Sequence, residues 1–131
     1  MKRLAIIPLA AAAFAAAAQI PAGKEASEAE GRAVISIAQC LAVGLPEEWQ
    51  IAVMDINLDK PYDETGGVRY FMARSASEEP TEPFTPCDVK YPAKTLIDAR
   101  NSQAEARRGW IGARVTVFRD GRYNIRYGYP K

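Results

Sequence analysis

Apolar and polar positions recur with two different periods along this chain, and each period predicts a different kind of element. Between residues 27 and 44 the apolar residues recur every three or four positions, which is the spacing of an amphipathic helix. Ser27 and Glu30 form the pattern of a capping box at its start, and Gly44 followed by Pro46 is typical of a helix end. The apolar stripe of this helix consists of Val34, Ile37, Ala38 and Leu41.

The rest of the chain predicts strands and a second helix. Residues 49–59 alternate strictly, so that one face of the strand is fully apolar. Residues 68–75 predict a second strand, and residues 76–92 contain four prolines, so we expect an irregular connection there. Residues 93–109 predict a helix that stops at Gly109. The apolar face of the first strand consists of Ala52, Met54, Ile56 and Leu58.

The last 22 residues, from Trp110 on, predict a β-hairpin around Asp120 and Gly121. A two-residue loop would send the apolar positions of its two strands to opposite faces, which a half-buried sheet does not allow. A three-residue loop of Arg119, Asp120 and Gly121 brings them to one face, with the glycine in the left-handed region. The predicted register pairs Val117 with Tyr123, Val115 with Ile125, and Ala113 with Tyr127.

These elements follow each other in the order α-β-β-α-β-β. Short connections make each strand pair antiparallel, and the apolar strand faces need a cover. The sequence therefore predicts an α+β fold, in which a four-stranded antiparallel sheet carries both helices on one face.

The same register places Arg114 directly opposite Arg126 on the other face of the hairpin, and Phe118 opposite Arg122. Like charges that face each other across a strand pair destabilise the sheet. Asp55 of the first strand points to the face opposite the apolar one, so its carboxylate is one candidate to offset the two arginine charges. The long arginine side chains can also turn apart into water. An acidic protein partner is a third interpretation, and nucleic acid, for which we see no signature, is a fourth that we do not expect.

The N-terminal stretch predicts an export signal. Lys2 and Arg3 precede an apolar run, and small residues at Ala16 and Ala18 give a cleavage site before Gln19. We therefore expect residues 1–18 to be a signal peptide and residues 19–131 a single domain, periplasmic or secreted. The run is short for a membrane span, so we expect no stable membrane insertion after cleavage, although an uncleaved N-terminal anchor is the alternative.

Charge is distributed unevenly along the chain. Residues 19–65 contain 3 basic and 9 acidic side chains, whereas residues 99–131 contain 8 basic and 2 acidic ones. This asymmetry indicates either that the two halves pack side by side and neutralise each other or that one of them forms a binding face.

Cys40 and Cys87 are the two cysteines of the chain. In an oxidising compartment such a pair is expected to form a disulfide. Two separate buried thiols are the alternative, because a free cysteine packs like a small apolar residue.

Signatures of catalysis are missing from the sequence. The chain contains no histidine, which excludes Ser-His-Asp and Cys-His catalysis, and its cysteines do not form a C-x-x-C pair. Adjacent acidic residues occur at 47–48 and 78–79, where solvated loop carboxylates are the expected interpretation. We expect a protein that is not an enzyme and that binds no metal and no cofactor.

The chain also resembles the YezG-like immunity (antitoxin) family of bacteria over roughly residues 34–130. The resemblance includes a Pro-Glu-Trp-like entry into the first strand, a strand that Trp opens, an Asp-Gly-basic-aromatic turn and a Tyr-x-Tyr end. The matching residues are Pro46, Glu47, Trp49, Trp110, Asp120, Gly121, Tyr123, Tyr127, Tyr129 and Pro130.

The resemblance implies a non-enzymatic protein that binds and neutralises a protein partner, a toxin, here as an exported variant. The expected contact residues are Arg114, Arg122 and Arg126, with Tyr129 and Trp110 near the outer end of the hairpin. Most aromatic residues should nevertheless belong to the core. The alternative is a small periplasmic structural or envelope-associated protein without a toxin partner.

Overall fold

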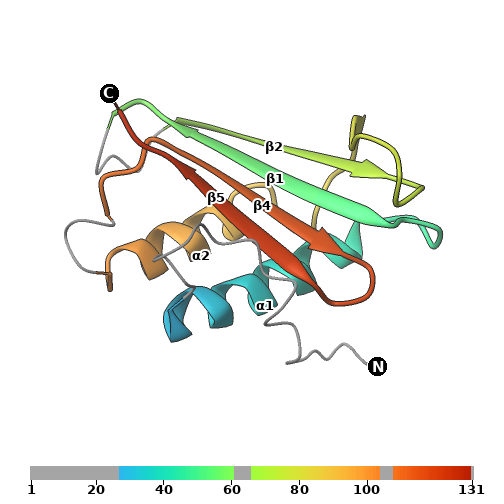
Figure 1. Cartoon of the computed structure of the whole chain (residues 1–131), viewed down its shortest axis with the longest axis horizontal. Coiled ribbons are helices and arrows are strands. Elements are labelled where there is room, and N and C mark those ends of the chain that lie inside the picture. Colours follow the sequence, from blue (N-terminus) through green and yellow to red (C-terminus); the bar gives the residue numbers. More distant parts are fainter. Residues whose placement is uncertain (1–26, 61–65, 104–107, 131) are drawn as a thin grey trace.

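A five-stranded antiparallel sheet with two helices on one face forms the protein (Figure 1). The structure, a computed structural model, describes residues 27–60, 66–103 and 108–130. The expected signal peptide lies outside these residues. The elements are α1 (Glu28–Val43), β1 (Ile51–Leu58), β2 (Gly66–Ala73), β3 (Glu82–Pro83), α2 (Tyr91–Arg100), β4 (Gly112–Phe118) and β5 (Tyr123–Gly128).

The sheet has the strand order β3-β2-β1-β4-β5, so β1 occupies its centre. This arrangement confirms the predicted α+β fold with both helices on one face. The prediction of four strands missed β3, which pairs Glu82 with Met72 and Pro83 with Phe71. A proline has no backbone N–H to donate to a neighbouring strand. It is tolerated in β3 because this strand lies at the edge of the sheet.

The hairpin has the predicted register. Val117 pairs with Tyr123, and the pairing continues without a slip to Gly112 and Gly128. Gly121 has a φ of 98°, the left-handed conformation that the three-residue loop requires. The register prediction is therefore confirmed, and the parity of every side chain in β4 and β5 follows from it.

The core fills the space between the helices and the inner face of the sheet. The predicted stripe of α1 and the predicted apolar face of β1 both contribute to it, and the capping box of Ser27 and Glu30 is present at the start of α1. The largest fully buried apolar side chains belong to Trp110, Ile37, Leu41, Met54, Met72, Leu96 and Ile125.

Helix α2 begins and ends earlier than the predicted range 93–109. The Asp88 carboxylate accepts hydrogen bonds from the backbone N–H groups of Lys90 (2.8 Å) and Tyr91 (2.9 Å), so the first turn forms before residue 93. These bonds also lower the pKa of Asp88. At the other end the Ser102 hydroxyl donates to the Ala99 carbonyl (2.7 Å), which favours a turn over another helical residue.

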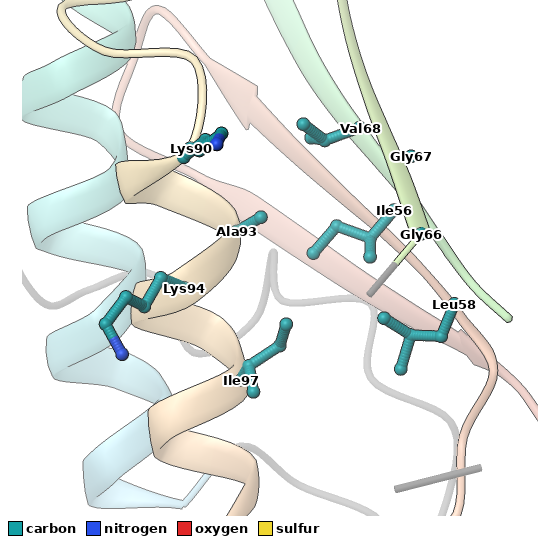
Figure 2. A pocket seen from close by; sticks show the side chains of 9 residues that line it. All are labelled: Ile56, Leu58, Gly66, Gly67, Val68, Lys90, Ala93, Lys94 and Ile97. Carbon is teal, nitrogen blue, oxygen red and sulfur yellow. The ribbon is translucent and has the colours of Figure 1, made fainter. Parts of the chain in front are cut away.

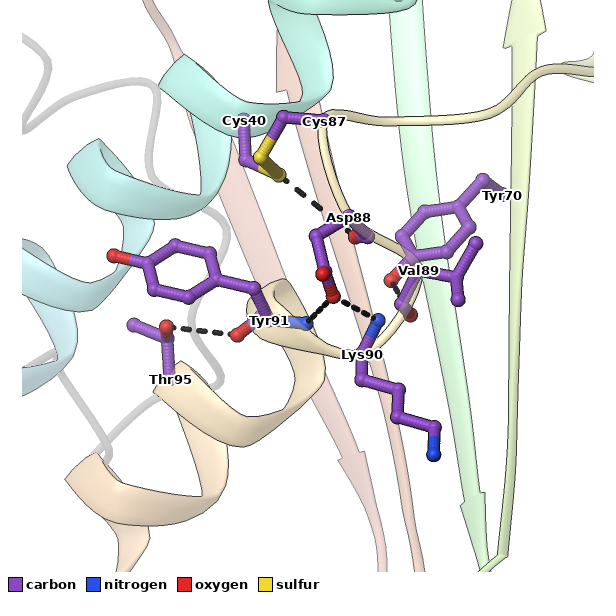
Figure 3. Close-up of a disulfide and its surroundings, with 8 residues drawn as sticks. All are labelled: Cys40, Tyr70, Cys87, Asp88, Val89, Lys90, Tyr91 and Thr95. Atoms are coloured by element: carbon purple, nitrogen blue, oxygen red, sulfur yellow. Dashed lines mark hydrogen bonds between the residues drawn. A yellow bond between two sulfur atoms is a disulfide. The ribbon is translucent and has the colours of Figure 1, made fainter.

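A disulfide joins α1 to the segment that leads into α2 (Figure 3). Cys40 and Cys87 have their Cα atoms 4.9 Å apart, and the Cys87 N–H donates to the Cys40 carbonyl at 2.9 Å. The disulfide is therefore formed, and the alternative of two separate thiols is wrong. Such a bond fits a protein of an oxidising compartment.

A tyrosine fixes the same segment to the sheet. The Tyr70 hydroxyl of β2 donates to the Val89 carbonyl at 2.6 Å, as Figure 3 shows. Burial, with a further contribution from the charge of Asp88, raises the pKa of Tyr70 to about 12. The hydroxyl therefore stays protonated and keeps this bond at any physiological pH.

Removal of the disulfide should destabilise the fold. The bond closes a loop over a sequence separation of 47 residues, which corresponds to about 4 kcal/mol of unfolding free energy in the chain-entropy model. We expect the variant C40S/C87S to unfold at a correspondingly lower urea concentration, measured by circular dichroism. Reduced wild-type protein is the control and should unfold at about the same concentration as the variant. An unchanged midpoint in both would contradict the prediction.

Two glycines of the α1 region should respond in opposite directions to alanine. A Cβ on Gly44 would lie 1.6 Å from the Thr85 carbonyl oxygen, so Gly44→Ala must push two backbone segments apart, at a cost of about 1–3 kcal/mol. A Cβ on Gly31 would meet nothing within 4 Å, so Gly31→Ala should stabilise the helix by up to about 1 kcal/mol. Thermal unfolding of both variants tests this, and a shift of the same sign in both would be the contrary result.

Candidate functional site

The helix-free face of the sheet is the surface opposite α1 and α2 (Figure 1). Among the described residues, no helix covers it. Its side chains alternate with those of the core, because successive residues of a strand point to opposite faces. The outward residues of its four long strands are Asn57, Asp55, Val53 and Ile51 in β1, Gly67, Arg69, Phe71 and Ala73 in β2, Gly112, Arg114, Thr116 and Phe118 in β4, and Asn124, Arg126 and Gly128 in β5.

One row across this face contains three arginines and one carboxylate. The registers place Arg69 of β2 beside Asp55 of β1, Asp55 beside Arg114 of β4, and Arg114 beside Arg126 of β5. We call these four residues the arginine row. The row brings together side chains from four strands, and only Arg114, Arg126 and Asp55 were identified from the sequence.

Asp55 neutralises part of this charge. Its Oδ1 accepts from Arg114 Nε at 2.7 Å, and its Oδ2 accepts from Arg114 Nη2 at 2.8 Å, a two-point contact. The Asp55 side chain is 15% exposed and that of Arg114 is 50% exposed. The bond to Asp55 raises the pKa of Arg114. The prediction that Asp55 offsets the hairpin arginines is confirmed for Arg114.

Arg126 and Arg69 carry the charge that Asp55 does not offset. Within the described part of the chain, the Arg126 side chain makes no hydrogen bond and no ion pair. Arg69 lies over the ring of Phe71, with its guanidinium carbon 5.4 Å from the ring centroid. Both side chains are exposed, so the row presents an excess of positive charge to solvent.

An apolar centre lies beside the arginine row. Val53 is only 2% exposed and Ile51 only 6%, although no described helix covers this face. The half-buried Phe118 packs against them and Phe71 flanks Val53 in the next strand. An arginine lies over each of the two aromatic rings. Arg69 lies over Phe71, and the Arg122 guanidinium lies 4.6 Å from the Phe118 ring centroid.

On the other side of the row the face has almost no side chains. Gly67, Gly112 and Gly128 lie in one register line with Asn57. A Cβ on Gly67 or Gly128 would meet nothing within 4 Å. The arginine row therefore borders an open strip from which a partner can approach the guanidinium groups.

Two predicted contact residues do not belong to this surface. Trp110 is 1% exposed, stacks on Tyr127 with a centroid distance of 5.3 Å, and lies under the guanidinium of Arg100. Tyr129 is half-buried and packs against the same core. The expectation that they contribute an exposed contact surface is wrong for Trp110, because this residue precedes β4, does not follow the alternation of that strand, and packs into the core. Arg122 lies at the margin of the helix-free face, where it pairs with Asp120 at 2.8 Å.

Sequence reasoning missed Arg69, Phe71 and the glycine strip. Their signal was present in β2, where Gly67, Arg69, Phe71 and Ala73 occupy alternate positions. This alternation was not recognised because the inward positions of β2 begin with a glycine, Gly66, and are therefore not apolar throughout.

The most deeply buried carboxylate has a structural role. Glu30 is 2% exposed, accepts from the Ser27 N–H at 2.8 Å, and accepts a hydrogen bond from the Tyr127 hydroxyl. These bonds link α1 to β5. The acidic pair at 47–48 is also structural in part, since Arg74 pairs with Glu48 and the Glu47 carbonyl accepts from Arg119.

Two comparisons with known sequences bear on the family of this chain. Neither a scan against protein-family models nor a search of curated proteins found a match to this chain. The resemblance to the YezG-like immunity family therefore stays a prediction. No cluster of three or more potential metal ligands occurs among the described residues, and none of the described helices is long and apolar enough to cross a membrane.

Asp55 should stabilise the fold mainly through Arg114. In a double-mutant cycle of Asp55→Ala and Arg114→Ala, we expect a coupling free energy of about 1 kcal/mol, at the upper end for partly exposed pairs because the contact is two-point. Urea denaturation of the four proteins measures it. The cycle of Asp55→Ala with Arg126→Ala is the control and should give a smaller coupling. Equal couplings in the two cycles would show that Asp55 acts on the row as a whole.

Proposed function

We propose that this chain is an exported, non-enzymatic binding protein, and that its helix-free face binds an acidic surface of a protein partner. The observation that carries the proposal is the arginine row. Three guanidinium groups lie there around the Asp55 carboxylate, with Glu79 as a further negative charge that acts on Arg114, on a face that no described helix covers. Charged side chains of this kind steer a complementary partner and fix its orientation.

The composition of the face supports a protein as the partner. Interfaces between proteins are enriched in arginine and aromatic residues, and their centres are apolar. Here Val53, Ile51 and Phe118 form an apolar centre, and arginines lie along its margin. A typical stable interface buries about 1,600 Å² in total, of which each partner contributes half.

The same face is less suited to nucleic acid. Single strands bind to proteins by stacking their bases on open aromatic rings. Here both rings are half-buried, and each already has a guanidinium over it, Arg69 over Phe71 and Arg122 over Phe118.

A toxin is the partner that the resemblance to immunity proteins suggests. In this proposal the partner acts in the compartment to which the chain is exported, and the face neutralises it by covering an acidic part of its surface. The disulfide fits such an oxidising compartment. The rival proposal is an envelope protein without a stoichiometric partner, which would bind anionic surfaces only weakly and in a salt-sensitive way.

Substitution of one arginine should separate the two proposals. Arg126→Glu reverses the charge of a side chain that has no ion pair within the described residues, so the fold should tolerate it. In a pull-down from the native cell envelope with C-terminally tagged protein, we expect a single stoichiometric protein that survives a high-salt wash. Retention by Arg126→Glu should fall at least about tenfold, because a like charge then faces the acidic partner.

Arg32→Glu is the matched control. It makes the same charge change on α1, on the other face of the sheet, where Arg32 forms an exposed ion pair with Glu28 at 2.7 Å. We expect this variant to retain the partner as the wild type does. Equal loss in both variants, or retention of nothing beyond material that salt removes, would contradict binding through the arginine row.

A further inference from the structure

A pocket of about 400 Å³ lies on the helix-covered side of the sheet, between α2 and the ends of β1 and β2 (Figure 2). Five apolar residues line it, two glycines form part of its wall, and two lysines stand at its helical side. Its volume falls within the range of small-molecule sites, about 300–1,000 Å³. The apolar lining consists of Ile56, Leu58, Val68, Ala93 and Ile97.

Small residues leave this space open. Ala93 and Ile97 are the α2 residues that face the strands here, and the first of them has only a methyl group. Gly66 has a φ of 149°, and a Cβ there would lie 2.0 Å from the Asn57 carbonyl oxygen. The glycine is therefore required by the close approach of β1, and its backbone forms part of the pocket wall.

The two lysines differ in direction and in pairing. Figure 2 shows the Lys90 ammonium on the side of α2 that faces the strands, whereas the Lys94 side chain points away from them. Lys94 pairs with Asp98 at 3.5 Å. The Lys90 ammonium makes no hydrogen bond and no ion pair with any described residue. Lys90 is thus the cation available to a ligand.

Several contacts hold Lys90 in place. Its backbone N–H donates to Asp88, and the segment before it is fixed by the disulfide of Cys87 and by the bond from Tyr70 to the Val89 carbonyl (Figure 3). The Asp88 carboxylate accepts hydrogen bonds from two backbone N–H groups and none from the ammonium, although the charge of Lys90 also contributes to the lowered pKa of Asp88. A rigid backbone therefore presents one unpaired positive charge beside an apolar cavity.

We propose that this pocket binds a medium-chain fatty acid, with the acyl chain on the apolar lining and the carboxylate at Lys90. An apolar cavity at whose edge one described lysine, Lys90, has no ion pair matches an anion with one hydrocarbon chain. Each methylene that the cavity buries should strengthen binding about fourfold, until the cavity is full. This site lies on the face of the sheet opposite the arginine row and doesn't depend on it.

Calorimetric titration of the disulfide-bonded protein with decanoate tests the proposal. We expect saturable one-to-one binding, weaker binding of octanoate, and no binding of decylamine, which has the same chain and the opposite charge. Lys90→Ala should weaken decanoate binding about tenfold, since a charge-assisted contact is lost. Lys94→Ala is the matched control and should stay within twofold of the wild type.

Filling the cavity is the second arm. Val68→Phe should abolish decanoate binding, and Ala93→Leu should do the same if Val68→Phe fails to fold. Thermal unfolding verifies the fold of each variant, and methyl NMR shifts on adding decanoate should be confined to Ile56, Val68, Ala93 and Ile97. Arg126→Glu should leave decanoate binding unchanged, which separates this proposal from the one on the protein partner.

Three outcomes would overturn the proposal. The first is the absence of decanoate binding at millimolar concentration. The second is binding that decylamine matches or that Lys90→Ala and Val68→Phe leave unchanged. The third is binding to phosphatidylglycerol vesicles in a co-sedimentation assay without any binding of free decanoate, which would assign Lys90 to a membrane surface.

Discussion

The alternation of the central strand β1 is the constraint on which the rest of the structure depends. β1 pairs with β2 on one side and β4 on the other, so its parity is transmitted to the whole sheet. Met54 is fully buried under the helices, and its neighbour Asp55 faces the other way. A slip of one residue would bury the carboxylate and expose the core, which makes this register strongly preferred.

The hairpin must agree with β1, and its turn ensures that it does. The left-handed conformation of Gly121 closes a three-residue loop, which places Val115 and Ile125 against the helices together. The same turn sends Arg114 and Arg126 to the opposite face. The close approach of two like charges is thus a consequence of core packing, and Asp55 relieves only part of it.

The segment between β3 and α2 is irregular in sequence and still firmly fixed. Cys87 links it to α1, and the Tyr70 hydroxyl links it to β2. Asp88 then supplies the first hydrogen bonds of α2. Because these contacts come from three different elements, the segment acts as a joint between the helix layer and the sheet, and it sets the position of Lys90.

The sequence by itself determined the fold class, the limits of α1, the hairpin register and the opposition of Arg114 and Arg126. These features depend on hydrophobic periodicity, helix capping and turn chemistry. All three are properties of residues close together in the sequence, so they can be predicted from it. Only the tertiary structure decided that Arg69 joins the row, that Asp55 pairs with Arg114, that Trp110 is buried, and that Cys40 meets Cys87. Contacts between strands and helices far apart in the chain depend on strand order and on packing, neither of which leaves a local signal. The tertiary structure also decided the end of α2, where the side chains of Ser102 and Gln103 both donate hydrogen bonds to the Ala99 carbonyl.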